Sequence, residues 1–235
     1  MPMEKIDVCI VTRDGKIPIG LEYIPIKELI INTDKPIGVA RKLCIQQVKT
    51  PIFAFIDDDM KIDKYWFAIL YSVIKRDDVG AVWGTTTGEG YGWFNKFSYD
   101  YIGVKELKHG ERFNTNNCLI KTELIKDWIA SYGLNCYEDL DIGNHIIDKG
   151  YKVLFIPSTA IHYKGWSGLK RSALWAGYRW VEGYQNSNKI REYIRRIFAP
   201  FWIMMLKGIP ASIYAFYRNF WFIIGMVKKD FKLEE

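Results

Sequence analysis

Cysteine and histidine are scarce in this chain of 235 residues, which has four Cys and three His. The cysteines stand at positions 9, 44, 118 and 136 without a C-x-x-C spacing, so they favour reduced thiols in a cytosolic protein over a disulfide framework or a zinc site. Repeats and low-complexity tracts are also lacking, which excludes repeat architectures. Because residues 1–5 lead directly into a predicted strand, no signal peptide is expected.

Negative charge is in the minority, because 33 Lys and Arg stand against 27 Asp and Glu, for a formal net charge of +6. Phosphates, nucleic acid and an anionic membrane surface all suit this balance. The basic residues cluster with an apolar C-terminal tail instead of forming a separate stripe, so nucleic acid is not expected as a partner. The length allows one large domain, or one domain with an appendage.

Strand and helix patterns alternate over the first two thirds of the chain. The predicted strands cover residues 6–12, 27–32, 53–56, 79–85, 117–121, 152–156 and 160–163, and the predicted helices cover residues 38–48, 64–75, 122–131 and 139–149. Residues 60–63 are expected to form a turn into a helix. The alternation predicts an α/β fold with a mostly parallel sheet, in which ligands bind beyond the carboxyl ends of the strands.

Three adjacent carboxylates, Asp57, Asp58 and Asp59, follow the apolar strand predicted over 53–56. Ionised acids repel one another at a partly buried strand end, and a divalent cation relieves that repulsion. Oxygen ligands suit Mg²⁺ or Mn²⁺, which commonly hold phosphates. Because alternate strand residues share a face, Asp57 and Asp59 are expected to act together. By itself, such a run is more often a solvated acidic turn than a metal site.

Other acids and a histidine bear on this choice. Asp14 and Asp34 also follow predicted strands, so a single binding edge would collect them with the three carboxylates. Glu138 and Asp139 begin a predicted helix, where acids also favour the helix dipole, so taken alone they favour a structural role. His162 ends a predicted strand; a lone His is more often structural, but imidazole is also a common metal ligand beside carboxylates.

The order of these motifs resembles the family-two glycosyltransferases of the GT-A fold, over roughly residues 5–166. The matching positions are Thr12, Asp34, Asp57-Asp58-Asp59, Glu138-Asp139, Gly150-Tyr151-Lys152, Pro157 and His162. A bare Asp-x-Asp is a weak match, whereas this combination in this order is specific. The resemblance implies a nucleotide-sugar-binding, Rossmann-like catalytic domain over 1–166, with a mixed, mostly parallel sheet flanked by helices.

The resemblance also implies how the donor is bound. Thr12, Asp14 and Asp34 would lie by the nucleobase and ribose of a UDP- or GDP-sugar, with Arg41 facing the nucleotide and Asp58 on the same donor side. The sequence departs from the family here, because the segment between the first two strands is short and broken, and Asp14 stands where Asn is common. These departures concern the base-binding pocket and not the fold.

The metal and acceptor sites follow from the same resemblance. Asp59 would bind Mn²⁺ or Mg²⁺ directly, Asp57 would reach the ribose or a metal-bound water, and His162 would complete the metal site. Asp139, with Glu138 beside it, would lie at the acceptor and act as general base in an inverting transfer. If the acceptor were a lipid phosphate, already an anion, Asp139 would orient it more than deprotonate it.

The C-terminal segment, residues 167–235, has helical periodicity and a different composition. It is rich in apolar and aromatic residues, with no charge-free run of the roughly 18–20 residues that a spanning helix needs. Arg179-Trp180 resembles the end of a Q-x-x-R-W signature of processive family members, but Ala176 replaces the Gln, so a chance match is favoured. Interfacial helices are expected, against the alternative that the apolar stripe packs on the catalytic domain or another subunit.

Together these observations predict a metal-dependent hexosyltransferase held peripherally on the cytoplasmic face of the cell membrane. The location suggests a lipid-linked acceptor, such as a polyprenyl phosphate or a lipid-linked glycan. Three alternatives fit the sequence less well. A haloacid dehalogenase-type phosphatase would need D-x-D-x-[TV] on the first strand. Here the acids follow the third predicted strand, and the position that should be Thr or Val is Lys61. A nucleic-acid binder is disfavoured by the charge distribution, and a non-catalytic membrane scaffold of the same fold by the intact acids and His162.

Overall fold

The computed structural model describes residues 4–34, 36–89, 103–111, 113–129, 138–163, 170, 173–174, 176–178, 189–207 and 209–227. The chain divides into two compact units. The first unit takes in residues 1–87 and 98–163, and the second takes in residues 88–97 and 164–235.

An eight-stranded sheet forms the centre of the first unit, in the order β2-β1-β3-β7-β5-β8-β4, with β6 paired to β8. The strands are β1 Ile6–Val11, β2 Ile26–Asn32, β3 Ile52–Ile56, β4 Met60–Ile62, β5 Val79–Glu89, β6 Lys105–Glu106, β7 Asn117–Lys121 and β8 Lys152–Tyr163. Strand β1 runs parallel to β2 and β3, whereas β7 is antiparallel to β3 and β5, and β8 to β4 and β6. The predicted class, an α/β fold with a mixed sheet flanked by helices, is confirmed.

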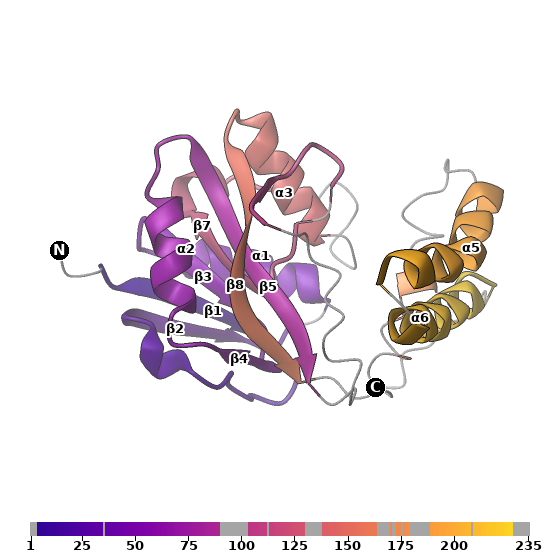
Figure 1. The fold of residues 1–235 in the computed structure, drawn as a ribbon. Helices are drawn as coiled ribbons and strands as arrows, with labels where there is room; N and C mark the ends of the chain where they lie inside the picture. Colours follow the sequence, from indigo (N-terminus) through magenta and orange to yellow (C-terminus); the bar gives the residue numbers. More distant parts are fainter. Residues whose placement is uncertain are drawn as a thin grey trace. The chain divides into compact units, whose positions relative to one another are not determined.

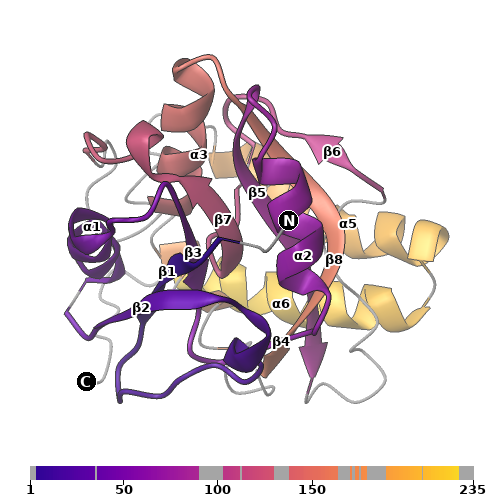
Figure 2. The same ribbon diagram turned by 90° about the vertical axis from the view of Figure 1, so that its left-hand side faces the viewer.

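Three helices in the described part of the first unit cover the two faces of this sheet. They are α1 Ile37–Gln47, α2 Trp66–Ile74 and α3 Glu138–Asp148. The core on one face contains α2 with Val8, Ala54 and Ile56, and the core on the other face contains α1 and α3 with Phe53 and Phe55. Alternate residues of each buried strand therefore pack into two different cores. The helices lie on either side of the sheet (Figure 1, and turned by 90° in Figure 2).

The cysteines of the first unit lie within these cores. Cys9, Cys44 and Cys118 are buried free thiols, whereas Cys136 lies outside the described residues. Burial raises the pKa of the Cys118 thiol to about 12, so this sulfur stays protonated and unreactive at neutral pH.

Two strand predictions need correction. Residues 60–62, predicted as a turn, form β4 and pair with β8, because Met60 and Ile62 are buried while Lys61 is exposed, which is the period of a strand. The two strands predicted over 152–163 are one strand, β8. Pro157 lacks an amide hydrogen, but it lies between the segment that pairs with β6 and the segment that pairs with β4, so no ladder bond is lost on that edge.

The other corrections concern where elements end. The strand predicted over 79–85 continues as β5 to Glu89. The helix predicted from Thr122 is only a short 3-10 turn, Thr122–Leu124, and residues 130–131 lie outside the described part of the chain. Tertiary contacts override the helical pattern, because Lys126 Nζ donates to the carbonyl oxygens of Ile45, Gln46 and Val48 at the end of α1.

The second unit is helical. Helix α5 covers Lys189–Lys207 and α6 covers Ile209–Val227, and residues 173–174 and 176–178 are also helical. Between α5 and α6, Asn219 Nδ2 donates to the Arg196 carbonyl at 2.9 Å, and the Arg196 guanidinium lies 3.7 Å from the Phe222 ring centroid. Gly177 and Gly225 allow close approach, because a Cβ on either would collide with the backbone carbonyl of the facing segment. None of the described helices is long and apolar enough to cross a membrane.

Candidate active site

The three carboxylates lie at the edge of the sheet where β3 ends. The Asp57 amide donates to the Asn116 carbonyl oxygen at 3.0 Å, at the point where β7 begins. Because β1, β2 and β3 are parallel, Thr12 after β1 and Asp34 after β2 lie at this same edge. The edge therefore collects the residues that the sequence predicts for donor binding.

Thr12 and Asp58 are joined directly. Thr12 Oγ1 donates to Asp58 Oδ2 at 2.6 Å and lies 3.3 Å from Asp14 Oδ1, while Lys16 forms an ion pair with Asp14 at 2.6 Å. Burial raises the pKa of Asp58, helped by the charges of Asp59, Asp57 and Asp14, although the Thr12 hydrogen bond opposes the shift. The hydrogen bond from Lys16 lowers the pKa of Asp14. Asp58 thus links the residue after β1 to the acidic run, and burial and the neighbouring charges disfavour its ionised form.

Arg41 of α1 lies beneath the acidic run, with its side chain only 5% exposed. Its Nη2 contacts Asp57 Oδ1 at 3.2 Å, and its Nη1 donates to Glu138 Oε1. Burial lowers the pKa of the guanidinium, but the charges of Glu138, Asp57 and Asp139 outweigh burial and raise it above its usual value. One buried cation thus neutralises acids from two distant segments. The nucleotide contact predicted for Arg41 stays a prediction.

Glu138 and Asp139 form the first turn of α3, and both are buried. The Leu140 amide donates to Asp139 Oδ1 at 2.8 Å, so this carboxylate also satisfies a backbone group at the helix start. Acids in a first turn interact favourably with the helix dipole. The structural alternative is therefore real for Asp139, while the Arg41 contact ties Glu138 to the acidic run as well.

His162 is brought beside the acidic run by strand pairing. Met60, which follows Asp59, is the register partner of His162 in the β4–β8 pair. The side chain of His162 lies outside the described part of the structure, and among the described side chains no group of three His, Cys, Asp or Glu forms a metal-binding cluster. The donors that are described, Asp57 and Asp59, are hard carboxylate oxygens, and burial and repulsion at Asp58 favour a cation.

Asp34 is the least connected of the predicted residues. It is exposed after β2, and its amide donates to Asn32 Oδ1 at 2.8 Å. The structure thus brings Thr12, Asp14 and Asp58 together, and Arg41, Asp57 and Glu138 together, and leaves Asp34 on the rim. Arg179-Trp180 lies outside the described residues.

Sequence reasoning missed a polar network beside Asp57. Asn117 Oδ1 accepts hydrogen bonds from Trp66 Nε1 at 3.1 Å and from the Gly84 amide at 2.9 Å. Asn117 Nδ2 donates to Thr86 Oγ1 and to Asn116 Oδ1, both at 2.9 Å. A pair of amide side chains at the start of a buried strand is the signal that could have indicated it, because polar groups there need partners.

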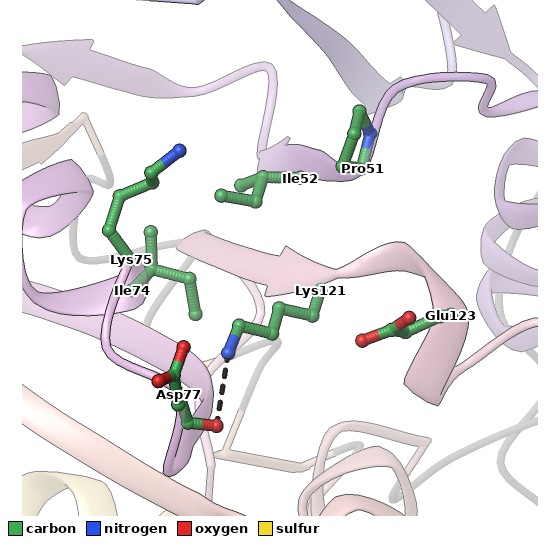
Figure 3. A pocket seen from close by; sticks show the side chains of 7 residues that line it. All are labelled: Pro51, Ile52, Ile74, Lys75, Asp77, Lys121 and Glu123. Carbon is green, nitrogen blue, oxygen red and sulfur yellow. Dashed lines mark hydrogen bonds between the residues drawn. The ribbon is translucent and has the colours of Figure 1, made fainter.

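The described cavities lie away from these residues. A cavity of about 250 Å³, lined in part by Pro51, Lys121 and Glu123, lies where β3 begins and β7 ends, which is the opposite end of the sheet from Asp57 (Figure 3). Lys121 Nζ is occupied there by the carbonyl oxygens of Arg76 and Asp77, at 2.8 and 3.3 Å. We therefore place the candidate site at the acidic edge, which is the edge of the sheet where Asp57, Asp58 and Asp59 follow β3, and not in this cavity.

Solved structures share this fold. GalNAc-T7 with UDP, GalNAc and Mn²⁺ is 12% identical, with a TM-score of 0.51 over 93% of this chain and 56% of its own, so this chain spans little more than half of that protein. The mannosyltransferase PcManGT from Pyrobaculum calidifontis, in complex with GDP-Man and Mn²⁺, is 11% identical, with a TM-score of 0.51 over 90% of this chain and 73% of its own. No curated protein matches the sequence.

The mixed sheet, its flanking helices and these neighbours define a GT-A glycosyltransferase fold. Residues 21–128 match the family of glycosyl transferase family 2. This match covers a little under half of the chain, and together with the shared fold it supports a family-two glycosyltransferase.

Proposed function

We propose that this glycosyltransferase moves a sugar, with inversion, from a UDP- or GDP-sugar to a lipid-linked acceptor at a membrane surface. The observation that carries the donor assignment is the acidic edge, where Thr12, Asp57 and Asp58 meet beyond the ends of parallel strands. In such folds, this edge is where nucleotides bind. The neighbours bound to UDP or to GDP-mannose support the same donor class.

The residues at this edge have two proposed roles, donor binding and metal binding. Thr12, Asp14, Asp34 and Asp58 would bind the base and ribose side of the donor, and Asp57, Asp59 and His162 would hold Mn²⁺ or Mg²⁺. The metal supplies positive charge that stabilises the diphosphate leaving group. The protein's own contribution is to hold Asp57 and Asp58 in place before the donor arrives, through Arg41 and Thr12.

Asp139 is the proposed base for a hydroxyl acceptor. It directly follows Glu138 in the first turn of α3, and the Arg41–Glu138 pair ties that turn to the acidic edge. A sugar hydroxyl must lose its proton as it attacks, and a carboxylate within reach can accept it. A phosphate acceptor needs no such base, so Asp139 would then orient the anion.

The helix pair α5–α6 supports the membrane assignment. Its apolar face comprises Ile194, Ile197, Phe198, Phe201, Trp202, Met204 and Met205 of α5, and Ile209, Ile213, Phe216, Phe220 and Val227 of α6, all exposed. Phe201 and Trp202 are each more than 60% exposed, and Arg195 is exposed on the same helix. Exposed aromatic residues beside basic ones suit the headgroup region of an anionic bilayer on the cytoplasmic side.

The donor assignment is tested with a panel of UDP- and GDP-sugars, incubated with and without Mn²⁺, by measuring the nucleotide released on transfer to polyprenyl phosphate and to lipid-linked saccharides. We expect one donor to react only with metal, and Asp59→Ala and His162→Ala to lose most of the activity. Binding without turnover of any donor would point instead to a scaffold. Full activity in both variants would remove the proposed metal site.

The acceptor class is tested with Asp139→Asn under the same conditions. For a hydroxyl acceptor, we expect a loss of about 10²–10⁴-fold in kcat, which is the usual contribution of a general base. For a phosphate acceptor, we expect a far smaller loss in kcat and a rise in KM for the acceptor.

Flotation of the full chain with vesicles of anionic and of neutral lipid tests the membrane assignment. Failure of the chain to float with either kind of vesicle would contradict it.

A further inference from the structure

The Arg41 guanidinium is the one described group that touches both the donor side and the acceptor side of the proposed site. Asp57, 16 residues further along the chain, follows β3, and Glu138, 97 residues further along, begins α3. The side chains of Arg41 and Glu138 are 5% and 7% exposed, and that of Asp57 is 28% exposed. Two carboxylates from separate elements therefore share one cation that water barely reaches.

The planar shape of the guanidinium makes this sharing possible. Nη1 is directed to Glu138 and Nη2 to Asp57, so each carboxylate has its own nitrogen. The Arg41 Cζ atom also lies 5.8 Å from the Phe55 ring centroid, on the face of the sheet that α1 and α3 cover. An ammonium group has no such fork and cannot hold two carboxylates in fixed directions.

We infer that Arg41 is a positioning residue that couples the proposed metal site to the proposed acceptor site. It fixes Asp57 and the first turn of α3, which carries Asp139, on a single group. This inference rests on the proposed function, because it assigns Asp57 to the donor side and Asp139 to the acceptor side. Arg41 itself acts through these carboxylates and need not touch either substrate.

The coupling has a direction that follows from charge. Glu138 neutralises part of the Arg41 cation, which leaves Asp57 freer to interact with a divalent ion. Without the Glu138 charge, the whole cation acts on Asp57, so a divalent ion binds more weakly there. Couplings between sites commonly amount to about 5–150-fold in affinity.

The test measures Mn²⁺ binding by titration calorimetry, with UDP or GDP present, in the full-length chain. We expect Glu138→Gln to weaken Mn²⁺ binding by about tenfold. The matched control is Asp141→Asn, which removes a buried carboxylate from the same turn of α3 that accepts a hydrogen bond from Trp128 and not from Arg41. This control should change Mn²⁺ affinity by less than about twofold.

A second comparison separates coupling through Arg41 from simple loss of a nearby negative charge. In an Arg41→Gln background the cation is removed, so adding Glu138→Gln should change Mn²⁺ affinity by less than about twofold. Circular dichroism establishes that Arg41→Gln is folded; if it is not, the comparison of Glu138→Gln with Asp141→Asn decides alone. Equal weakening by Glu138→Gln and Asp141→Asn, or a Glu138→Gln effect that persists beside Gln at position 41, would overturn the coupling.

The two proposals fail in different ways. A wild-type chain that binds no Mn²⁺ with either nucleotide overturns the proposed function and the coupling with it. A wild-type chain that binds Mn²⁺, with affinity unchanged in Glu138→Gln, overturns the coupling alone.

Discussion

The acidic edge of the sheet and the helix pair α5–α6 depart in opposite ways from the usual sorting of residues in proteins. At the acidic edge, charged side chains such as Arg41, Glu138 and Asp139 are buried. On the helix pair, large apolar side chains such as Phe198 and Trp202 are exposed. A buried charge requires a partner of opposite sign, and an exposed apolar face requires a partner other than water.

The two regions differ in whether the fold itself supplies the partner that each of them requires. Within the first unit, Arg41 already pairs with Asp57 and Glu138, so these charges have partners of opposite sign inside the fold. The apolar face of the helix pair is not covered by α5 or α6, whose mutual contact uses Asn219, Arg196 and Phe222. The first region should therefore respond to mutation through stability and ion binding, and the second through association.

The largest effect is expected from Arg41→Met. The change leaves the carboxylates of Asp57 and Glu138 without their buried cation, which typically costs about 3–5 kcal/mol in the free energy of unfolding. Urea denaturation followed by circular dichroism measures it. The control is Arg76→Met, which breaks an ion pair with Asp78 at 3.1 Å that is about half exposed and should cost less than about 1 kcal/mol. Equal costs would mean that burial at the acidic edge has no consequence.

The next effect concerns the helix pair. The double change Phe198→Ser and Phe201→Ser removes two exposed rings, each of which would contribute about 1.5 kcal/mol or more on entering an apolar phase. Vesicle binding, measured by flotation, should weaken by about a hundredfold. The matched control is the double change Ile17→Ser and Ile129→Ser, at two exposed apolar positions of the first unit, which should leave binding unchanged. Weakening by both pairs would deny the helix pair a special role.

A smaller effect is expected within the helix pair itself. Asn219→Ala removes the hydrogen bond to the Arg196 carbonyl and the contact that Arg196 Nη1 makes with Asn219 Oδ1 at 3.3 Å. The loss should destabilise the pairing of α5 and α6 by about 1–2 kcal/mol. Limited proteolysis of the full chain reports it as faster cleavage between residues 189 and 227. Ile213→Ala, at an exposed position of α6, should not accelerate cleavage.

The smallest effect is expected at an exposed carboxylate of the first unit. Hydrogen bonds from Lys149 and then His145 lower the pKa of Asp127 to about 2. Because the folded-state pKa is depressed, the stabilisation is present above the ordinary Asp pKa and is lost as the pH falls through about 2. Asp127→Asn should lower the melting temperature by about 1 °C at pH 6 and have no effect near pH 2. A larger effect at pH 2 than at pH 6 would reverse the assigned sign.

The sequence predicted the parts of this molecule that depend on local pattern. The Asp57–Asp59 run follows its buried strand as predicted, because alternating apolar residues identify a strand without knowledge of its neighbours. The helix expected from Thr122 was wrong, because the chain there is held by Lys126 bonding to the end of α1. Such a contact joins segments 78–81 residues apart and leaves no local signal.

For the candidate site, the sequence proposes members but not the contacts between them. Thr12, Asp57, Asp58 and Glu138 were identified by motif order, and the structure adds which of them touch. The Arg41–Glu138 pair could not be read from the chain, since it depends on how α1 and α3 pack on the same face of the sheet. The Asn117 network was missed for the same reason, because its partners Trp66 and Gly84 come from two other elements.

The amide side chain of Asn117 has a consequence for how the first unit opens. Its oxygen binds Trp66 at the start of α2 and the amide of Gly84 in β5, and its nitrogen binds Thr86 further along β5. Local fluctuation of β5 beyond Gly84 must therefore break several bonds at once, so these segments open as one cooperative unit. The Gly84 amide should exchange its hydrogen with solvent as slowly as the core strands do, although it lies close to the edge where substrates would enter and leave.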